Sequence, residues 1–219
     1  MPTSSIQRRA LQIRKRLPDR LRRVLRLARH AVTTGQASLE ISPDLVADCR
    51  VCASRLELVK FMPQRSRVAE VGTYQGSFAA HILAAADPVE LHLIDIDLTE
   101  LNAAVRADSR VVLHEGRSES VLAGFPDAHF DWIYVDGDHS SEGVTRDAHA
   151  AAPKVRPGGY MVFNDFAHID PFLGTYGVHR AVVDFAVAQR WTFAWLACQP
   201  SALYDVVLRR PDAPEPGPG

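Results

Sequence analysis

The chain has 219 residues, of which 47% are hydrophobic and 23% are charged. This composition excludes a disordered protein and is sufficient for one domain with a full hydrophobic core. No apolar run reaches the roughly 18 to 20 residues of a membrane-spanning helix, and the N-terminus lacks the apolar stretch of a secretory signal. The three cysteines, Cys49, Cys52 and Cys198, make no disulfide framework. We therefore expect a cytoplasmic protein.

The first 30 residues differ in charge from the rest of the chain. They hold ten Arg or Lys residues and one acid, Asp19, for a net charge of +9. The remainder must then carry −10, because the whole chain carries −1, so we expect no nucleic-acid binding by the body. Residues 1–38 are predicted to be a basic amphipathic arm that contacts a membrane surface or a protein partner, or covers the body. The apolar residues at helical spacing are Leu17, Leu21, Val24, Leu25 and Ala28.

After this arm, residues 42–61 are predicted to form one helix. Ser42 is a typical N-cap, and Pro43 suits the first helical position. Cys49 and Cys52 form a C-x-x-C pattern within this stretch, but no second pair accompanies it. We therefore interpret both as small core residues rather than as a metal or redox site.

From residue 67 the hydrophobic pattern alternates between strand and helix. Strands are predicted at 68–71, 91–95, 111–114, 130–135, 160–163, 191–196 and 204–208, and helices at 77–86, 98–106, 118–123, 141–152 and 178–189. Repeated βαβ units predict a doubly wound, mainly parallel α/β sheet, and the last two strands predict a C-terminal antiparallel hairpin. We expect the domain to span 39–210, with a disordered, Pro-rich tail at 211–219.

The turn after the first of these strands indicates the type of ligand. It reads Glu70-Val71-Gly72-Thr73-Tyr74-Gln75-Gly76-Ser77. A dinucleotide-binding turn has glycine where Glu70 stands, and a carboxylate there would repel a pyrophosphate. The next strand ends in Asp95, which is placed to bind a ribose diol. A nucleoside ligand without phosphates fits both acids, and S-adenosylmethionine (SAM), with its ammonium and sulfonium groups, is such a ligand.

A second group of polar residues follows the fourth strand, where Asp136, Asp138 and His139 lie within four positions. A solvated acidic turn is the simpler interpretation, but the carboxyl ends of parallel strands are where such sheets bind ligands. Asn164 and Asp165 end the neighbouring strand, so they should meet Asp136 there. Three oxygen ligands suit Mg²⁺, and we predict Asp136, Asn164 and Asp165 as its ligands.

These motifs recur in order along the chain and resemble those of class I SAM-dependent methyltransferases. The branch with the greatest similarity is that of the sugar O-methyltransferases of the macrocin type, methyltransferase family 24. The resemblance covers about residues 62–210 and implies a Rossmann-like sheet of seven strands. The motifs are Glu70 to Gly76, Asp95, Glu115-Gly116-Arg117-Ser118, Tyr134 to Ser140, Pro157-Gly158-Gly159 and Gly177-Val178.

The resemblance also implies roles for individual residues in SAM binding. Its methionine part would contact the first turn, its ribose Asp95, and its adenine the region of Arg117 and Ser118. The full predicted cofactor set is Glu70, Gly72, Tyr74, Gly76, Ser77, Asp95, Arg117, Ser118 and Asp136.

For catalysis, we predict His139 as the base that deprotonates an acceptor hydroxyl, with Asp138 as the second candidate. The leading hypothesis is a Mg²⁺-assisted SAM-dependent O-methyltransferase whose acceptor is a hydroxyl of a sugar or related metabolite. Alternatives left open are methylation of a catechol-like phenol, a non-catalytic SAM-binding module that docks through its basic arm, and a metal-dependent hydrolase. Homo-oligomerisation is also left open. Arg146 and Asp147 are expected to form a surface or capping pair.

Overall fold

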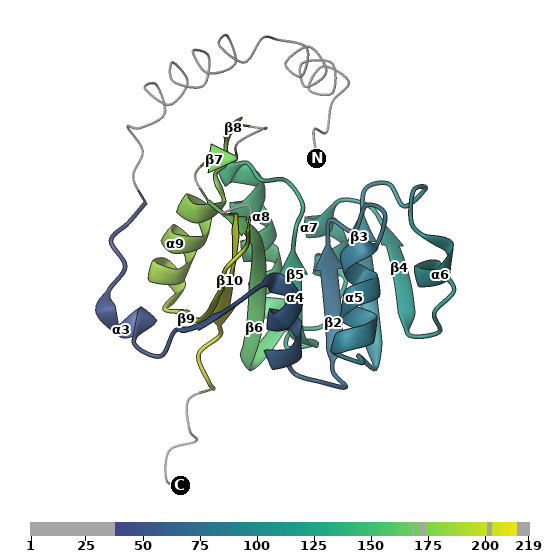
Figure 1. Cartoon of the computed structure of the whole chain (residues 1–219), viewed down its shortest axis with the longest axis horizontal. Coiled ribbons are helices and arrows are strands. Elements are labelled where there is room, and N and C mark those ends of the chain that lie inside the picture. Colours follow the sequence, from purple (N-terminus) through teal and green to yellow (C-terminus); the bar gives the residue numbers. More distant parts are fainter. Residues whose placement is uncertain (1–37, 168, 171–173, 201–202, 214–219) are drawn as a thin grey trace, which may run out of the picture.

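The computed structural model describes residues 38–167, 169–170, 174–200 and 203–213. The predictions for the basic arm at 1–37 and for the last six residues of the tail fall outside these ranges. A single large β-sheet forms the middle layer of the described structure, and helices pack on both of its faces (Figure 1). None of the described helices is both long and apolar enough to cross a membrane.

The sheet and its helices account for most of the described chain. The helices are α3 (Pro43–Val46), α4 (Arg55–Leu58), α5 (Ser77–Ala85), α6 (Ala103–Arg106), α7 (Ser118–Ala123), α8 (Ser141–Ala151) and α9 (Val178–Gln189), with 3-10 turns η1 (Val59–Phe61) and η2 (Ala152–Lys154). The strands of the large sheet are β1 (Arg50–Cys52), β2 (Arg67–Val71), β3 (Glu90–Asp95), β4 (Val111–Glu115), β5 (Phe130–Val135), β6 (Val155–Phe166), β9 (Thr192–Ala197) and β10 (Tyr204–Arg209). Two short strands, β7 (Ile169–Asp170) and β8 (Gly174–Thr175), pair with each other in a separate two-stranded sheet.

The strand order of the large sheet is β1-β9-β10-β6-β5-β2-β3-β4. Strands β6, β5, β2, β3 and β4 are parallel, whereas β10 is antiparallel to both of its neighbours, β6 and β9. This arrangement confirms the predicted doubly wound sheet with a C-terminal antiparallel hairpin. The described sheet has eight strands instead of the expected seven, and the additional one is β1.

The predicted single helix over 42–61 is wrong. It is divided into α3, the edge strand β1, α4 and η1. Backbone pairing explains the difference, because β1 runs parallel to β9 and pairs Val51 with Leu196. An edge strand with open hydrogen-bonding groups attracts such pairing, and this tertiary contact outweighs a local helical pattern. The core placement of Cys52 is confirmed, since only 6% of the residue is exposed.

The predicted helix over 98–106 is shorter than expected. The helical residues begin at Ala103, because the side chain of Asn102 accepts a hydrogen bond from the Ala104 amide at 2.8 Å. Asparagine at such a position caps a helix and stops it from extending backwards. The residues before Asn102 form turns, in which Asp97 accepts from Thr99.

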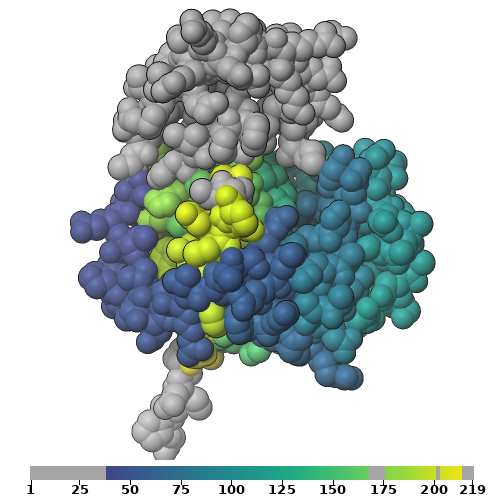
Figure 2. Space-filling model, viewed as in Figure 1, coloured from purple at the N-terminus to yellow at the C-terminus, as the bar shows by residue number. Residues whose placement is uncertain are grey.

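Two hydrophobic clusters hold the layers together, one on each face of the sheet. On one face, buried residues of α8 and α9 such as Val144, Ala148 and Val182 pack on the strands. On the other, Phe78 and Ile82 of α5 pack with residues of α4 and η1. Figure 2 shows yellow atoms from near the C-terminal end of the described chain beside blue atoms of its N-terminal part.

Candidate active site

The chain reverses its direction of travel across the sheet between β2 and β5. From β2 it proceeds outward to β3 and β4, and then returns to β5 and β6 on the other side. Ligands of doubly wound sheets bind at this switch point, outside the carboxyl ends of the strands. Gly72 follows β2 with φ +88°, and a Cβ there would lie 2.1 Å from the carbonyl oxygen of Asp136. Glycine is therefore required for the β2 and β5 ends to meet.

Glu70 is the most buried acid at this switch point. The residue is 1% exposed, and its Oε2 has no hydrogen-bond partner within the described ranges. Burial raises the pKa of Glu70 well above its ordinary value, and the nearby charge of Asp136 adds to this effect. An ammonium group of a ligand would give the unpartnered oxygen a hydrogen bond and stabilise the ionised carboxylate.

Asp95 lies at the carboxyl end of β3, beside the turn that begins α5. Its Oδ2 accepts a hydrogen bond from the Tyr74 amide at 2.8 Å, and its Oδ1 accepts one from the Asp97 amide at 3.2 Å. These bonds fix the carboxylate in place, and each oxygen keeps a second lone pair for a ligand hydroxyl. The next residue, Ile96, is 58% exposed and offers an apolar surface beside it.

In addition to Gly72, the turn between β2 and α5 contains two residues with a positive φ angle. Tyr74 has φ +50° and Gly76 has φ +75°, and Gly76 is the N-cap of the helix that Ser77 begins. Both residues therefore adopt the left-handed conformation, which glycine tolerates without strain.

Arg117 and Ser118, which are predicted to lie near the adenine, have different hydrogen-bond partners. Ser118 donates a hydrogen bond to Asp147 at 2.5 Å, whereas the Arg117 Nε donates to Glu119 at 2.7 Å and the Arg117 side chain is 64% exposed. The expectation that Asp147 lies at the surface is wrong, because only 4% of the residue is exposed. Burial raises the pKa of Asp147, and its carboxylate lies beside Gly137, where an added Cβ would be 3.2 Å from Oδ2.

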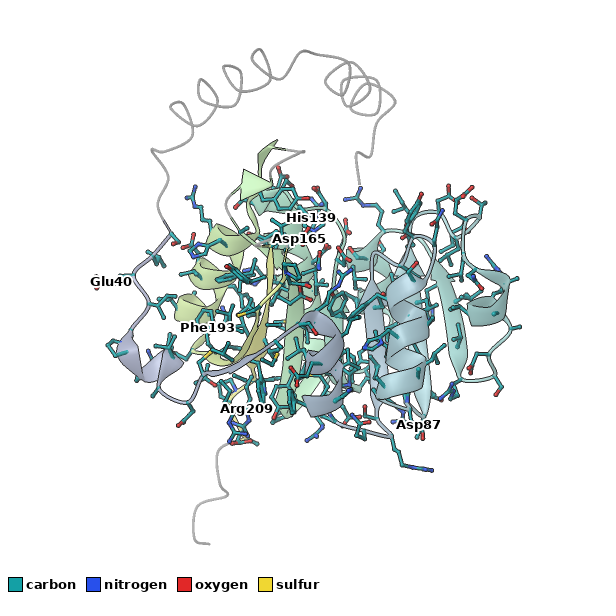
Figure 3. All side chains as sticks on the ribbon, viewed as in Figure 1. Glu40, Asp87, His139, Asp165, Phe193 and Arg209 are labelled. Carbon is teal, nitrogen blue, oxygen red and sulfur yellow. The ribbon has the colours of Figure 1, made fainter. Side chains whose placement is uncertain are left out.

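His139 lies between two carboxylates at the carboxyl edge of the sheet. Its Nε2 is 3.4 Å from Oδ1 of Asp136 and 3.7 Å from Oδ2 of Asp165, and Figure 3 shows His139 and Asp165 close together at this edge. Burial lowers the pKa of His139, but the two carboxylates outweigh burial and the net pKa is raised. Nε2 is buried and makes no hydrogen bond in the described part of the chain, so it can receive a proton from a ligand.

Three features orient this imidazole. The ring of Tyr176 stacks on it at 4.7 Å between centroids, with 17° between the planes. The Gly177 amide donates to the His139 carbonyl oxygen at 2.9 Å. Asp165 has φ +52°, a conformation that aspartate adopts more readily than most residues, and its carboxylate lies near Nε2.

Asp138, the second candidate base, is held by the helix that follows. Its Oδ1 accepts a hydrogen bond from the Ser140 amide and its Oδ2 one from the Ser140 hydroxyl, both at 3.0 Å. Ser140 is in turn the N-cap of α8 and accepts from the Gly143 amide. The geometry therefore indicates a capping role for Asp138 and leaves His139 as the better-placed base.

Asn164 belongs to a buried hydrogen-bonded network on the other side of Asp136. Its amide nitrogen donates to the Tyr134 hydroxyl at 3.1 Å and to Asp205 Oδ1 at 3.2 Å, while the Tyr134 hydroxyl donates to Asp205 Oδ2 at 2.8 Å. Burial raises the pKa of Asp205 to about 7. The guanidinium of Arg55, whose charge acts on Tyr134, Asp205 and Asp136, is the cation of this group.

The predicted metal ligands can be compared with this geometry. Asp136 and Asp165 both lie near the same imidazole nitrogen, at 3.4 and 3.7 Å, but their ligand atoms and that of His139 do not all lie within 4.8 Å of one another. Asn164 uses its amide nitrogen for Tyr134 and Asp205, so it would bind a metal through its amide oxygen. Carboxylate and amide oxygens are ligands that suit Mg²⁺.

Comparisons with known proteins identify similar domains and folds. Residues 69–166, from β2 to the end of β6, match the family model described as a methyltransferase domain. The match indicates a SAM-dependent methyltransferase domain in this part of the chain. No match is found among curated proteins.

Solved structures share the fold of this methyltransferase domain. An O-methyltransferase family protein from Burkholderia thailandensis is 14% identical, with 73% of this chain and 56% of that chain covered and a TM-score of 0.55. The N-methyltransferase NodS from Bradyrhizobium japonicum WM9 is also 14% identical, with coverages of 72% and 93% and a TM-score of 0.55. Fibrillarin from Aeropyrum pernix, solved with natively bound SAM, is 14% identical, with coverages of 70% and 72% and a TM-score of 0.54. At these identities the likeness concerns the fold alone.

Sequence reasoning missed several residues that shape the site. Tyr176, Asp205 and Arg55 come from segments far from the motifs, and each reaches the site through the folded chain. A polar residue within an apolar strand was the available signal for Asp205, which lies between Tyr204 and Val206. No comparable local signal marks Tyr176.

Proposed function

We propose that this methyltransferase acts on a hydroxyl group of a sugar or a related small metabolite, with assistance from Mg²⁺. The observation that carries the proposal is the buried, hydrogen-bond-free Nε2 of His139 between Asp136 and Asp165. A sugar hydroxyl scarcely ionises near neutral pH, so its methylation needs a base or a Lewis acid. A neutral amine acceptor would need this arrangement less.

The other end of the site supports SAM as the methyl donor. When bound, SAM supplies an electrophilic methyl group together with its leaving group. Glu70 would hold the ammonium of the methionine part, and Asp95 would accept hydrogen bonds from the ribose diol. The exposed Ile96 would pack against the adenine ring. Together these contacts orient the donor, and positioning alone can lower a barrier by about 7 to 11 kcal/mol.

His139 would take the proton of the acceptor hydroxyl. Asp136 and Asp165 would stabilise the imidazolium that results, because opposite charges within 4 to 6 Å favour the charged form. Stacking on Tyr176 keeps the ring in one plane, so Nε2 is presented in a fixed direction. Asp136, Asp165 and the amide oxygen of Asn164 would hold Mg²⁺, which would act as a Lewis acid on the acceptor oxygen.

The test is a labelled transfer assay on the full-length chain. SAM with a deuterated methyl group is incubated with matched acceptors, each sugar beside its amino-sugar counterpart and each catechol beside the corresponding phenol. Products are detected by mass shift, with Mg²⁺ and separately with EDTA, and SAM binding is measured by calorimetry under both conditions.

We expect SAM binding, transfer to sugar hydroxyls, and loss of transfer in EDTA that Mg²⁺ restores. Transfer to amines alone would contradict O-methylation, and transfer to catechols alone would favour a phenol acceptor. Full activity in EDTA would remove Mg²⁺ from the proposal. Failure to bind SAM would overturn it entirely.

A further inference from the structure

A second group of histidines lies at the opposite edge of the sheet from His139. Glu90 and His92 are at the start of β3, and His129 directly precedes β5. One nitrogen or oxygen atom from each of these three side chains lies within 4.8 Å of the others. The length of β5 separates this group from Asp136 by roughly 20 Å, at about 3.3 Å per residue. It is therefore distinct from the methyltransferase site.

His92 is the buried member of this group. The residue is 7% exposed, and its Nε2 is buried without a hydrogen-bond partner among the described residues. This nitrogen faces Glu90, whose Oε2 is 3.7 Å away. A buried polar atom without a partner costs free energy, and a bound ion is one of the explanations for such an atom in a native protein.

The other nitrogen of His92 is already satisfied. Its Nδ1 lies 2.9 Å from Nε2 of His114, so an Nδ1 proton donated to His114 leaves a lone pair on the His92 Nε2. Histidines that bind metals almost always hydrogen-bond through their second ring nitrogen in this way.

Aromatic side chains enclose the group. The Phe125 ring lies 5.1 Å from that of His92 and 5.2 Å from that of His129, and the Phe130 ring lies 4.8 Å from that of His129. These apolar walls limit the water that can reach the imidazoles. Glu90, with 44% of its side chain exposed, keeps the group open on one side.

We propose that Glu90, His92 and His129 bind one transition-metal ion, with Zn²⁺ as the best match, and that water is the fourth ligand. Imidazole and carboxylate are typical zinc ligands, at about 2.0 to 2.2 Å in a tetrahedral arrangement. That geometry places ligand atoms about 3.4 Å apart, near the 3.7 Å between His92 and Glu90. The ion would link β3 to the segment before β5 across β2, and it would stabilise this edge without entering the methyl-transfer reaction.

One contact competes with the metal. The Nε of Arg67 donates to Oε2 of Glu90 at 3.1 Å, so a bound ion must displace the guanidinium or use Oε1. Replacing this arginine should therefore tighten metal binding. If the cluster had only a structural role, replacing Arg67 would not increase the affinity for metal.

The experiment is a Zn²⁺ titration of the full-length, untagged chain, by calorimetry and by competition with a zinc-binding dye. Co²⁺ absorption reports the coordination geometry, and Mg²⁺ serves as a cation that avoids imidazole ligands. The test variants are Glu90→Gln, His129→Ala, Arg67→Ala and His114→Phe. The controls are His139→Ala, His149→Ala and Cys49→Ser, which remove other zinc-binding groups.

In an excess of Mg²⁺, which occupies the site proposed at Asp136 and Asp165, we expect one Zn²⁺ bound per chain and a rise in Tm of about 5 °C at saturating Zn²⁺. Glu90→Gln and His129→Ala should abolish this binding, His114→Phe should weaken it about 10- to 100-fold, and Arg67→Ala should strengthen it. The three controls should bind zinc as the wild type does. No zinc binding by the wild type, or binding that survives both ligand variants or is lost in a control, would overturn the proposal.

Discussion

Acidic side chains differ in burial and in their partners between the two edges of the sheet. At the amino edge, carboxylates meet cationic partners: the Arg110 guanidinium lies 2.7 Å from Asp108, and Lys154 lies 2.7 Å from Asp127. At the carboxyl edge, Glu70 and Asp147 are buried, and burial raises the pKa of each. These two acids of the amino edge are thus paired within the protein, whereas Glu70 at the carboxyl edge keeps one oxygen without a partner in the described part of the chain.

The imidazoles follow the same division. His139 at the carboxyl edge lies between two carboxylates, and its pKa is raised. His92 at the amino edge lies among other aromatic rings, and burial lowers its pKa to about 4. The same residue type is therefore suited to accepting a proton at one edge and to remaining neutral at the other. The difference comes from the neighbours and not from the histidine.

The largest effect should follow from His139→Ala. Removing the base should lower kcat about 10²- to 10⁴-fold on the best hydroxyl acceptor, with little change in SAM affinity. The matched change at the neighbouring position, Asp138→Ala, should cost about 1 kcal/mol of stability through the loss of its contacts at the start of α8, with turnover largely kept. Steady-state kinetics and urea unfolding check both. The reverse result would assign the base to Asp138.

The second effect tests the buried acid of the carboxyl edge. Glu70→Gln should weaken SAM binding about 10- to 100-fold, because a hydrogen bond to a charged group contributes about 1.5 to 3 kcal/mol. Glu90→Gln, the same change at the amino edge, should leave SAM affinity unaltered. Calorimetric titration of both variants with SAM makes the comparison, and equal affinities for the two would contradict the assignment of Glu70.

A smaller effect concerns a paired acid. Hydrogen bonds from Arg110 lower the pKa of Asp108 to about 2, from 3.8. Its pairing therefore stabilises the fold above pH 3.8, and this contribution is lost as the pH falls through 2. Asp108→Asn should reduce the free energy of unfolding by about 1 kcal/mol at neutral pH, given solvent screening, and by less in acid. Urea unfolding across this pH range measures it.

The smallest effect concerns Asp147, whose contribution to stability changes with pH in the opposite direction. Burial raises the pKa of Asp147 above 3.8, so the native state holds its proton more tightly than the unfolded chain does. The stability contributed by this group is full below pH 3.8 and is lost as the pH rises through the raised pKa. Asp147→Asn, which cannot titrate, should gain stability relative to the wild type as the pH rises. A parallel pH profile of the two proteins in urea unfolding would show that burial at this position has no such consequence.

Local sequence was sufficient for much of the fold. The runs that form β2, β3, β4 and β5 alternate with helical patterns, and strand–helix–strand units in one chain can close only as a parallel sheet with right-handed crossings. Local sequence could not predict the pairing of strands that are distant in the chain. Val51 lies in a strand because β9 offers an open edge, and nothing near Val51 in the sequence specifies that edge.

For the candidate site, too, some features follow from the sequence and others from the tertiary structure. Sequence by itself determined which acids end the strands, since Glu70, Asp95 and Asp136 occupy the carboxyl ends of β2, β3 and β5, where a doubly wound sheet binds its ligand. Only the tertiary structure distinguished the surroundings of the two candidate bases, because Ser140 engages Asp138 whereas Tyr176 stacks on His139. The charge and spacing of residues can be read from the sequence. Burial and the partner of each polar atom depend on segments that meet only when the chain folds.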